Sequence, residues 1–230
     1  GGGSSVPRPG LISQAHGGVL FLDEAPEFAP TALESLREPL ESGSISISRS
    51  GGTAIFPAQF QLILAANPCP CGNRGTRGKD CTCSTLQRNR YASRLSGPLL
   101  DRFDIRLRVH QATKTARLKS AKDETRLDTS AWRERILEAR SRSRERLTGT
   151  PWRLNSQVSG AFLRRLNREN PEAVRVLDIA LTKGTISMRG YDRCLRVAWS
   201  IADLEGLARL NASVVGQALF LRGAESWAGE

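Results

Sequence analysis

The stretch that most constrains the fold runs Gly-Gly-Val-Leu-Phe-Leu-Asp-Glu, from Gly17 to Glu24. Its four consecutive apolar residues predict a strand of residues 18–23 that is buried on both faces, because such runs are typical of strands inside an α/β sheet. Asp23 and Glu24 then stand at the C-terminal end of the strand, where open α/β sheets bind ligands. One interpretation is that Asp23 holds Mg²⁺ and Glu24 orients a water for attack on a terminal phosphate. The other is an ordinary buried strand that ends in a helix-capping Asp-Glu pair.

Downstream, the pattern changes first to a helix and then to a hairpin. Leucines recur at helical spacing within residues 33–40, and Gly43 is a typical helix stop. Residues 44–56 alternate polar and apolar side chains before the Gly51-Gly52 turn and become apolar again after it, which predicts a β-hairpin with Arg49 near its tip. The helix and the hairpin separate the first buried strand from a second.

Two further strands and a polar helix are predicted in the first half of the chain. Residues 60–66 are apolar enough for a second buried strand, which ends at Asn67-Pro68. Residues 86–95 predict an arginine-rich helix, and residues 105–109 predict a third strand. The first half therefore has the composition of an α/β sheet with its connections.

From about residue 112 the pattern is wholly helical, which places a domain boundary there. Apolar residues recur at three- and four-residue spacing in most of these segments. The predicted helices span residues 130–147, 156–167, 171–183, 187–204 and 211–221. The fold class is therefore α/β in the first half and all-helical in the second.

The positive charge is concentrated in the helical half. Of the formal net charge of +11, residues 1–105 contribute 10 Lys+Arg against 9 Asp+Glu, whereas residues 106–230 contribute 24 against 14. Such an excess suits contact with a polyanion, and nucleic acid is the usual one. The alternative is a solvated surface, because the arginines at positions 140, 142, 144 and 146 alternate around one helix.

The chain has no apolar run near the roughly 18 residues that span a bilayer, and no basic-then-apolar segment at its start. We therefore expect a cytoplasmic protein without a membrane partner. In a reducing compartment, clustered cysteines are typical of metal sites more than of disulfides.

Four of the five cysteines form such a cluster. Cys69-Pro-Cys71 and Cys81-Thr-Cys83 are two Cys-x-Cys pairs separated by nine residues. Four thiolates can close a tetrahedral Zn²⁺ site and hold together a Gly- and Arg-rich loop. The usual spacing is Cys-x₂-Cys, so disulfides and free thiols remain as alternatives. Cys194 lies among apolar helical residues and is predicted to be a small core residue.

Taken in order, five sequence blocks resemble the AAA+ ATPases of the magnesium-chelatase type, and most closely the ComM/YifB family. The blocks extend over nearly the whole chain, and their order is more specific than any block alone. They are residues 17–24, Arg-Glu-Pro-Leu-Glu at 37–41, Ala-Ala-Asn-Pro-Cys-Pro-Cys-Gly at 65–72, Arg-Leu-Ser-Gly-Pro-Leu-Leu-Asp-Arg at 94–102, and Ser-Met-Arg-Gly at 187–190 with Ile-Ala-Asp-Leu at 201–204.

The resemblance implies a partial AAA+ P-loop-type sheet, from the Walker-B strand onward, in residues 1–111, and an all-helical lid domain in residues 112–230. It implies that Asp23 and Glu24 are the Walker-B pair, which serves Mg-ATP and its hydrolysis. Asn67 resembles sensor 1, whose side-chain amide helps to place the lytic water or contacts the γ-phosphate. The alternative role of Asn67 is that of a turn-former before Pro68.

Arg102 resembles the arginine finger that follows Leu-Leu-Asp in this family. Such a guanidinium reaches the nucleotide of the neighbouring subunit and offsets the charge of the transition state. The alternative is a structural ion pair with Asp101 or Asp104.

Arg189 resembles sensor 2, a phosphate-contacting guanidinium at the start of a helix in the lid. Arg193, one turn further along, competes for that role. The alternative for Arg193 is a surface ion pair with Asp192 or Asp203, which contributes little energy.

The resemblance also implies partners. The hairpin corresponds to the pre-sensor-1 hairpin that lines the central channel of related helicases, so Arg49 is implied to contact DNA phosphates. A solvated hairpin is the alternative. The family forms rings, with a hexamer as the expectation, and ComM-like proteins imply helicase or branch-migration activity in the recombination of incoming DNA. The other readings are a magnesium-chelatase-type ATPase subunit and a non-catalytic, zinc-stapled nucleic-acid-binding module.

The sequence contains no Gly-x-x-x-x-Gly-Lys-Ser/Thr P-loop, whose backbone amides and lysine hold the phosphates of ATP. The nearest segment, Gly72 to Asp80, has five residues between Gly72 and Gly78 and ends in Asp. The family places its P-loop upstream of the present residue 1. We therefore expect the chain to be the C-terminal part of a longer protein, and to hydrolyse ATP negligibly by itself.

Overall fold

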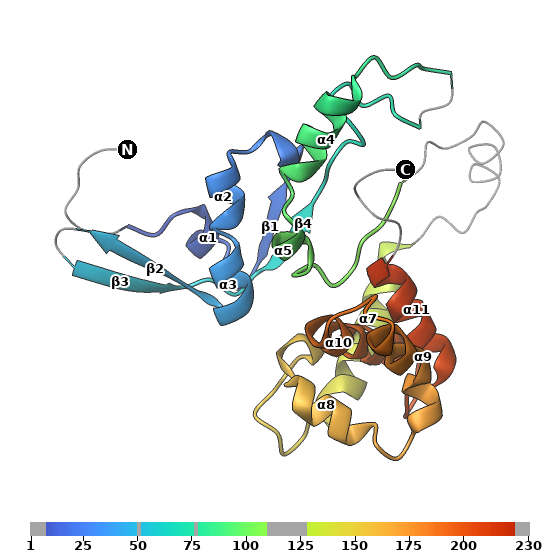
Figure 1. Cartoon of the computed structure of the whole chain (residues 1–230). Helices are drawn as coiled ribbons and strands as arrows, with labels where there is room; N and C mark the ends of the chain where they lie inside the picture. The colour runs from blue at the N-terminus through green and yellow to red at the C-terminus, as the bar shows by residue number, and fades with distance from the viewer. Residues whose placement is uncertain (1–7, 50–51, 76–77, 110–127, 224–230) are drawn as a thin grey trace. The chain divides into compact units, whose positions relative to one another are not determined.

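The computed structural model describes residues 8–49, 52–75, 78–109 and 128–223 (Figure 1). These residues form two compact units that divide between Phe103 and Asp104. The boundary predicted near residue 112 lies outside the described residues. Each unit has its own hydrophobic core.

The first unit is built on two parallel strands, β1 (Val19–Leu22) and β4 (Gln61–Leu64). They pair in a register that sets Leu20 opposite Leu62 and Leu22 opposite Leu64. Both strands were predicted, and both are confirmed over a shorter length. The four leucines belong to a core cluster with side chains from the helices that follow β1.

Burial of the first strand on both faces was predicted, and this prediction is wrong. Side chains alternate between the faces of a strand, so Val19 and Phe21 lie on the face opposite Leu20 and Leu22. In the described part of the chain the core packs against the leucine face. Val19 is therefore 59% and Phe21 58% exposed, and Ile63 beside Phe21 is 47% exposed.

Helices and a hairpin connect the two strands. A short α1 (Leu11–Gln14) precedes β1, and a 3₁₀ turn (Ala25–Glu27) follows it. The predicted leucine helix forms as α2 (Pro30–Glu34) and α3 (Arg37–Ser42). The chain leaves α3 through Gly43, whose φ of +71° is left-handed and costs a glycine little.

The predicted hairpin is confirmed. Strands β2 (Ser44–Arg49) and β3 (Gly52–Pro57) pair antiparallel and form a sheet separate from β1 and β4. In Figure 1 the hairpin extends away from the β1–β4 sheet. Its base is tied to α3, because the backbone N–H of Ser46 donates to Oε1 of Glu38 at 3.2 Å.

Beyond β4 the chain forms the cysteine loop, then α4 (Thr85–Ser93) and α5 (Gly97–Leu100). The predicted arginine-rich helix is thus confirmed as α4. The third strand predicted at residues 105–109 is wrong: these residues belong to no strand of the described structure. Alternating apolar residues make a strand only where a neighbour takes the backbone hydrogen bonds. Here the N–H of Arg106 donates to the carbonyl of Leu221 instead, at 2.8 Å.

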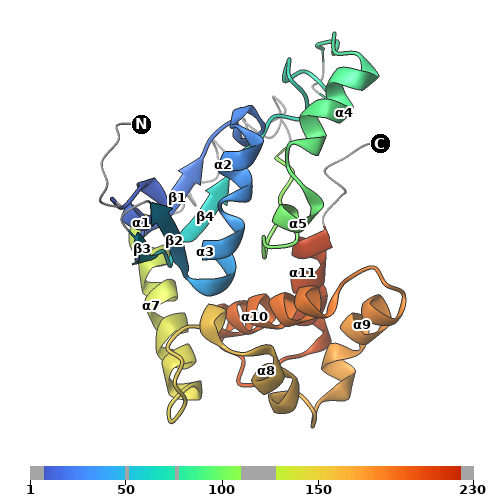
Figure 2. The ribbon, with the colours of Figure 1, turned by 60° about the vertical axis from the view of Figure 1, so that its left-hand side comes forward.

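The second unit is all-helical in its described part, as predicted. Its central helix, α10 (Met188–Glu205), contacts four others (Figure 2). These are α7 (Thr129–Arg146), α8 (Gly160–Leu166), α9 (Pro171–Thr182) and α11 (Ala212–Gly223). Helix α8 begins later than predicted, because residues 155–157 form a 3₁₀ turn and Ser159 caps the helix.

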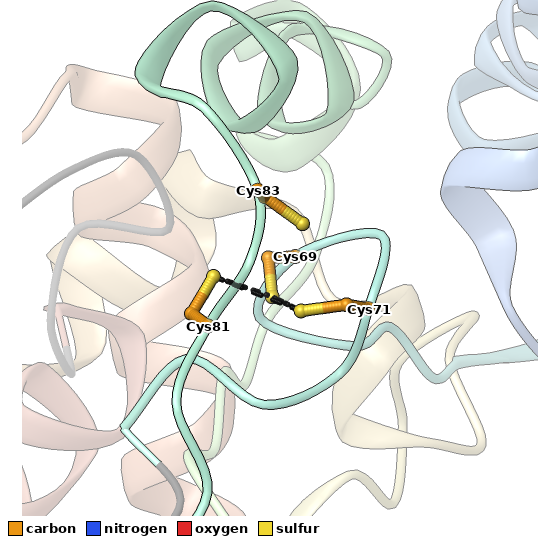
Figure 3. A group of neighbouring side chains, drawn as sticks. All are labelled: Cys69, Cys71, Cys81 and Cys83. Carbon is orange, nitrogen blue, oxygen red and sulfur yellow. Dashed lines mark hydrogen bonds between the residues drawn. The ribbon is translucent and has the colours of Figure 1, made fainter.

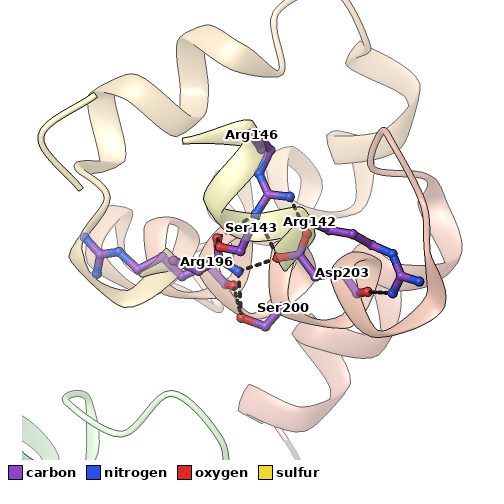
Figure 4. A network of polar contacts seen from close by, with 7 residues as sticks. Arg142, Ser143, Arg146, Arg196, Ser200 and Asp203 are labelled. Carbon is purple, nitrogen blue, oxygen red and sulfur yellow. Dashed lines mark hydrogen bonds and ion pairs between the residues drawn. The ribbon is translucent and has the colours of Figure 1, made fainter. Parts of the chain in front are cut away.

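A polar network joins α7 to α10, with Asp203 at its centre (Figure 4). Arg146 donates to both carboxylate oxygens of Asp203, one of them at 2.8 Å, and Asn155 donates to the same carboxylate at 2.8 Å. Arg142 donates to the backbone oxygen of Asp203 at 2.7 Å, and the Arg146 guanidinium lies 4.1 Å from the Trp199 ring centre. The interpretation of these arginines as merely solubilising is wrong for Arg142 and Arg146, which hold helices together.

A membrane-spanning helix must be both long and apolar. No helix in the described ranges combines the length and the apolar character that crossing a bilayer requires.

Candidate functional site

The sequence-predicted residues Asp23, Glu24 and Asn67 lie at one edge of the sheet. Because β1 and β4 are parallel neighbours, their C-terminal ends meet, and Asp23 and Asn67 lie just beyond those ends. The backbone continues the pairing beyond the strands: Ala65 N–H donates to Leu22 O, and Ala25 N–H donates to Ala65 O, both at 2.9 Å. All three candidate side chains are exposed. The edge therefore offers two carboxylates and one amide to a ligand.

Glu24 has an unusual backbone. Its φ of 50° and ψ of 41° make it the one non-glycine residue with positive φ among the described residues. A left-handed residue with a Cβ costs about 1 kcal/mol, so surrounding contacts must hold it. Ala25 and Pro26 are buried directly behind it, and its own N–H donates to Oδ1 of Asp23 at 2.9 Å. The turn thus fixes the two carboxylates relative to each other at the strand end.

Sequence reasoning missed Tyr91, which lies in α4 and is 5% exposed. The carboxylates of Glu27 and Glu24 act electrostatically on its hydroxyl. Burial, followed by the Glu27 charge, raises the pKa of Tyr91. The available signal was a single aromatic residue in a polar, arginine-rich helix, because such a residue needs a buried contact.

Helix α4 is also fixed to the turn that follows Glu24. Nη1 of Arg94 donates to the carbonyl of Pro26 at 2.7 Å and lies 3.3 Å from Oε2 of Glu27. The C-terminal end of α4 is therefore attached to the turn that follows β1.

The four clustered cysteines come together as predicted, and we call them the four-cysteine cluster (Cys69, Cys71, Cys81 and Cys83). Figure 3 shows their side chains converging from the two limbs of one loop. The Sγ atoms of Cys69, Cys71 and Cys81 are 3.4 to 3.7 Å apart, and all four sulfurs lie within 4.8 Å of one another. Four thiolates bound to Zn²⁺ at about 2.3 Å in a tetrahedron stand about 3.8 Å apart. The donor set and its spacing therefore fit zinc.

The disulfide alternative does not describe this structure. All five cysteines are free, and sulfur separations of 3.4 Å and more are far from the roughly 2.05 Å of a disulfide bond. The N–H of Asn73 is the main cause that lowers the pKa of the Cys71 thiol to about 6. Against a hydrogen bond from the backbone of Cys71, burial and the neighbouring cysteine side chains raise the pKa of the Cys83 thiol to about 11. The two shifts are opposite, so the case for a metal rests on the number and spacing of the sulfurs. Cys194 is buried in α10, as predicted.

Arg102 lies in the interior of its own unit, with a side chain that is 6% exposed. Its Nη2 forms an ion pair with Oε1 of Glu41 at 2.6 Å, and its Nη1 donates to the carbonyl of Pro98 at 2.5 Å. The partner Glu41 belongs to the Arg-Glu-Pro-Leu-Glu block and was not among the partners considered from the sequence. The arginine-finger role of Arg102 stays a prediction.

The two candidate arginines of α10 differ in their surroundings. Arg189 is exposed in the first turn, whereas Arg193 is 11% exposed and its Nη1 lies 2.8 Å from Oδ1 of Asp104. The alternative pairing of Arg193 with Asp192 or Asp203 is wrong, because those aspartates pair with Arg164 and Arg146. The sensor-2 role of Arg189 stays a prediction.

Arg49, the candidate DNA contact, ends β2, where its backbone pairs with Gly52. Its side chain lies outside the described part of the structure.

Two family models match the chain in succession. Residues 1–117 match the family "Magnesium chelatase, subunit ChlI", and residues 126–222 match "Magnesium chelatase, subunit ChlI C-terminal". The chain is 46% identical to an uncharacterised protein of Mycobacterium tuberculosis, with 96% of this chain and 43% of the relative aligned. It is 41% identical to the competence protein ComM of Haemophilus influenzae, over 96% of this chain and 42% of ComM. It is 38% identical to the uncharacterised protein YifB of Escherichia coli, over 89% of this chain and 39% of YifB.

The chain thus spans about two fifths of the length of these curated relatives. The two matched segments together cover nearly all of its residues. The Walker-B-like strand, the cysteine loop and the helical second half all fall within them. On these matches, the chain belongs to the magnesium chelatase ChlI family, as a relative of ComM and YifB.

Proposed function

We propose that this chain supplies the magnesium-binding and water-orienting edge of an AAA+ ATPase that acts on DNA. One observation carries the proposal: Asp23, Glu24 and Asn67 lie just beyond the C-terminal ends of two adjacent parallel strands. Family membership supports it, because the three residues lie in the blocks that carry the resemblance. The sequence contains no Gly-x-x-x-x-Gly-Lys-Ser/Thr segment, so the proposal concerns the magnesium and water side of the ATPase site.

Each residue at the edge has a distinct role in the proposal. The Asp23 carboxylate holds the Mg²⁺ of Mg-ATP, which neutralises developing charge on the phosphates. Glu24 accepts a hydrogen bond from the attacking water and orients it toward the γ-phosphate. The Asn67 amide donates to a γ-phosphate oxygen or to that water. Their exposure leaves room for nucleotide at the edge.

Guanidinium groups complete the proposed site. Arg189 acts as sensor 2 from the first turn of α10, and Arg102 acts as an arginine finger toward a neighbouring subunit. Both stabilise negative charge that spreads over the γ-phosphate in the transition state. An arginine finger that acts on the nucleotide of a neighbouring subunit requires the subunits to assemble into a ring, and we propose a hexamer. Residues 1–111 form the core part of each subunit and residues 112–230 its helical lid.

The four-cysteine cluster is proposed to bind one structural Zn²⁺. The four sulfurs have the number, type and spacing that a closed zinc site requires. The loop between the two pairs carries Gly72, Gly75 and Gly78, each at positive φ, and little apolar surface. A metal therefore supplies the cross-link that a hydrophobic core supplies elsewhere.

DNA is proposed as the partner because the second half of the chain is positively charged and because a relative is named as a competence protein. The second half of the chain carries 24 Lys+Arg against 14 Asp+Glu, and a relative is named as a competence protein. Phosphate contacts of this kind, with Arg49 on the hairpin among them, are sequence-independent and weaken with salt. We therefore propose helicase or branch-migration activity in the recombination of incoming DNA, in the cytoplasm.

The test uses the natural protein that contains this chain. Wild type and Glu24→Gln are mixed with forked and four-way DNA and with Mg-ATP, at several salt concentrations, and strand separation is followed. We expect unwinding by wild type that declines with salt and is lost in Glu24→Gln. Wild type that hydrolyses ATP but unwinds no DNA at any salt would contradict the DNA role and favour a chelatase-type subunit.

A further inference from the structure

The Arg102 side chain is folded back into its own unit, where it is 6% exposed. Its Nη2 lies 2.6 Å from Oε1 of Glu41 in α3, and its Nη1 donates to the carbonyl of Pro98 at 2.5 Å. Its Nε is buried and has no hydrogen-bond partner among the described residues. A buried donor without an acceptor is costly, so the guanidinium is not fully satisfied where it lies. To contact a nucleotide in another subunit, it must first leave this position.

The helix that precedes Arg102 has an anchor of its own. Oγ of Ser96 donates to Oε1 of Glu34, the last residue of α2, at 2.6 Å. The same oxygen accepts the N–H of Leu99 at 3.3 Å and so caps α5. Helix α5 is therefore held against α2 without help from Arg102, and the arginine can change partner by rotation of its side chain alone.

Glu41 is suited to release the guanidinium. Its side chain is 42% exposed, so the pair with Arg102 lies near the surface of the unit. A carboxylate offers two oxygens and one negative charge, whereas a γ-phosphate offers three oxygens and more charge. The two groups can therefore compete for one guanidinium, and the phosphate is the stronger competitor.

We propose that Glu41 holds Arg102 withdrawn inside its own subunit, and that the γ-phosphate of ATP in the neighbouring subunit takes the guanidinium from it. The inference rests on the proposed arginine-finger role of Arg102. Arg102 then has two alternative partners, a carboxylate at home and a triphosphate across the subunit boundary. ADP lacks the γ-phosphate and leaves Arg102 with Glu41.

Glu41→Gln tests the proposal, because it keeps the size of the side chain and an acceptor oxygen but removes the negative charge. A buried guanidinium that loses its counter-charge is costly to keep inside, so Arg102 should move outward. The matched control is Glu172→Gln, which removes the carboxylate of an exposed pair with Arg175 in the other unit. Both variants are made in the natural protein, and ring assembly and cooperative unfolding are checked for each.

The first readout needs no ATP hydrolysis. Phenylglyoxal modifies accessible guanidinium groups, and mass spectrometry follows its reaction with Arg102 in dilute protein without nucleotide. We expect labelling of Arg102 about tenfold faster in Glu41→Gln, and at the wild-type rate in Glu172→Gln. The exposed Arg144 of α7 should react equally in all proteins and so reports the activity of the reagent.

Amide hydrogen exchange separates release of the side chain from local unfolding. The N–H groups of Leu100 and Asp101 donate within α5, to the carbonyls of Ser96 and Gly97. We expect them to exchange at the wild-type rate in Glu41→Gln, because the anchor of α5 at Glu34 is intact. Faster exchange there that matches the faster labelling would mean that α5 unfolds, and would overturn the proposal.

Nucleotide should reverse the release in assembled rings. Mg-ATPγS is expected to slow the labelling of Arg102 in Glu41→Gln, because the guanidinium binds the γ-phosphate group, and Mg-ADP is expected to leave it fast. Labelling that Mg-ATPγS does not slow would overturn the proposal together with the finger role of Arg102.

The last readout is steady-state ATP hydrolysis. Glu41→Gln should raise kcat about threefold, and Glu172→Gln should leave it unchanged. Adding Arg102→Ala to Glu41→Gln should abolish the gain, because the gain acts through Arg102. Labelling of Arg102 at the wild-type rate in Glu41→Gln, or a kcat at or below that of wild type, would overturn the proposal. If wild type hydrolyses no ATP, the proposed function fails, and nucleotide-free labelling still decides whether Glu41 holds Arg102 inside.

Discussion

The guanidinium of Arg102 is paired with Glu41 of its own chain at 2.6 Å, inside the first unit. The pair joins α3 to the segment just after α5. The Arg102 side chain is 6% exposed and the Glu41 side chain is 42% exposed. The arginine has therefore lost more of its contact with water than the glutamate. Arg102 therefore has a structural role within its own unit, separate from the arginine-finger role proposed above.

Loss of Arg102 is therefore expected to destabilise the chain. Arg102→Ala should lower the free energy of unfolding by about 1–3 kcal/mol, less than for a fully buried pair because Glu41 can be solvated. Urea denaturation followed by circular dichroism measures it. The matched control is Arg175→Ala, whose ion pair with Glu172 is 3.7 Å long and exposed, and which should change stability by less than about 0.5 kcal/mol. Equal effects of the two variants would contradict the structural role.

The proposed role of Arg102 at the nucleotide of the neighbouring subunit leads to a separate prediction, for rings that contain two different variants. Glu24→Gln and Arg102→Ala should each abolish ATP hydrolysis when assembled alone. Mixed in equal amounts, they should recover about a quarter of wild-type activity, since each site takes Glu24 from one subunit and Arg102 from the next. Steady-state hydrolysis after co-assembly measures this. No recovery in rings shown to be mixed would mean that both residues act in the same subunit.

Asp203 is expected to be a main stabilising residue of the helical unit. It is 2% exposed and accepts from Arg146 and Asn155. Asp203→Ala leaves the 16%-exposed Arg146 side chain without its counter-charge and should cost about 3–5 kcal/mol of unfolding free energy. Arg144→Ala, an exposed position on α7, is the control and should stay within about 0.5 kcal/mol. A cost below about 1 kcal/mol for Asp203→Ala in chemical denaturation would contradict the network.

The four-cysteine cluster predicts a metal stoichiometry. Protein purified without chelator should contain one zinc per chain by elemental mass spectrometry, and Cys71→Ser should contain much less, because three thiolates leave the tetrahedron open. Cys194→Ser is the matched control, since this buried thiol is outside the cluster, and it should keep its zinc. Zinc retained in a Cys69→Ser, Cys71→Ser double variant would show that the metal binds elsewhere.

Local periodicity predicted most elements, because it reports which face of each segment is apolar. The β1 and β4 strands, the hairpin and the helices of the second unit follow from it, with ends that differ by a few residues. The meeting of Asp23, Glu24 and Asn67 was also predictable, because parallel strands deliver their ends to one edge. The two Cys-x-Cys pairs predicted that the four cysteines could come together, with disulfides and free thiols left as alternatives.

The features that the sequence did not predict are long-range polar contacts and the burial of the strand faces. Nothing in the local sequence links Arg102 to Glu41 or Arg146 to Asp203, since each pair is brought together by packing of whole elements. Residues 105–109 show that an alternating pattern does not supply a strand partner. The exposure of Val19 and Phe21 likewise depends on what covers the second face of the sheet, which the strand's own residues do not encode.

The proposed function depends most on Glu24, as the residue that orients water for ATP hydrolysis at this edge. Single-turnover hydrolysis of Mg-ATP by the natural protein tests this role, with nucleotide affinity measured in parallel, for wild type, Glu24→Gln and the exposed control Glu172→Gln. We expect Glu24→Gln to bind Mg-ATP with wild-type affinity and to hydrolyse it about 100-fold more slowly or worse, with Glu172→Gln unchanged. Hydrolysis by Glu24→Gln at the wild-type rate would show that Glu24 does not orient the water.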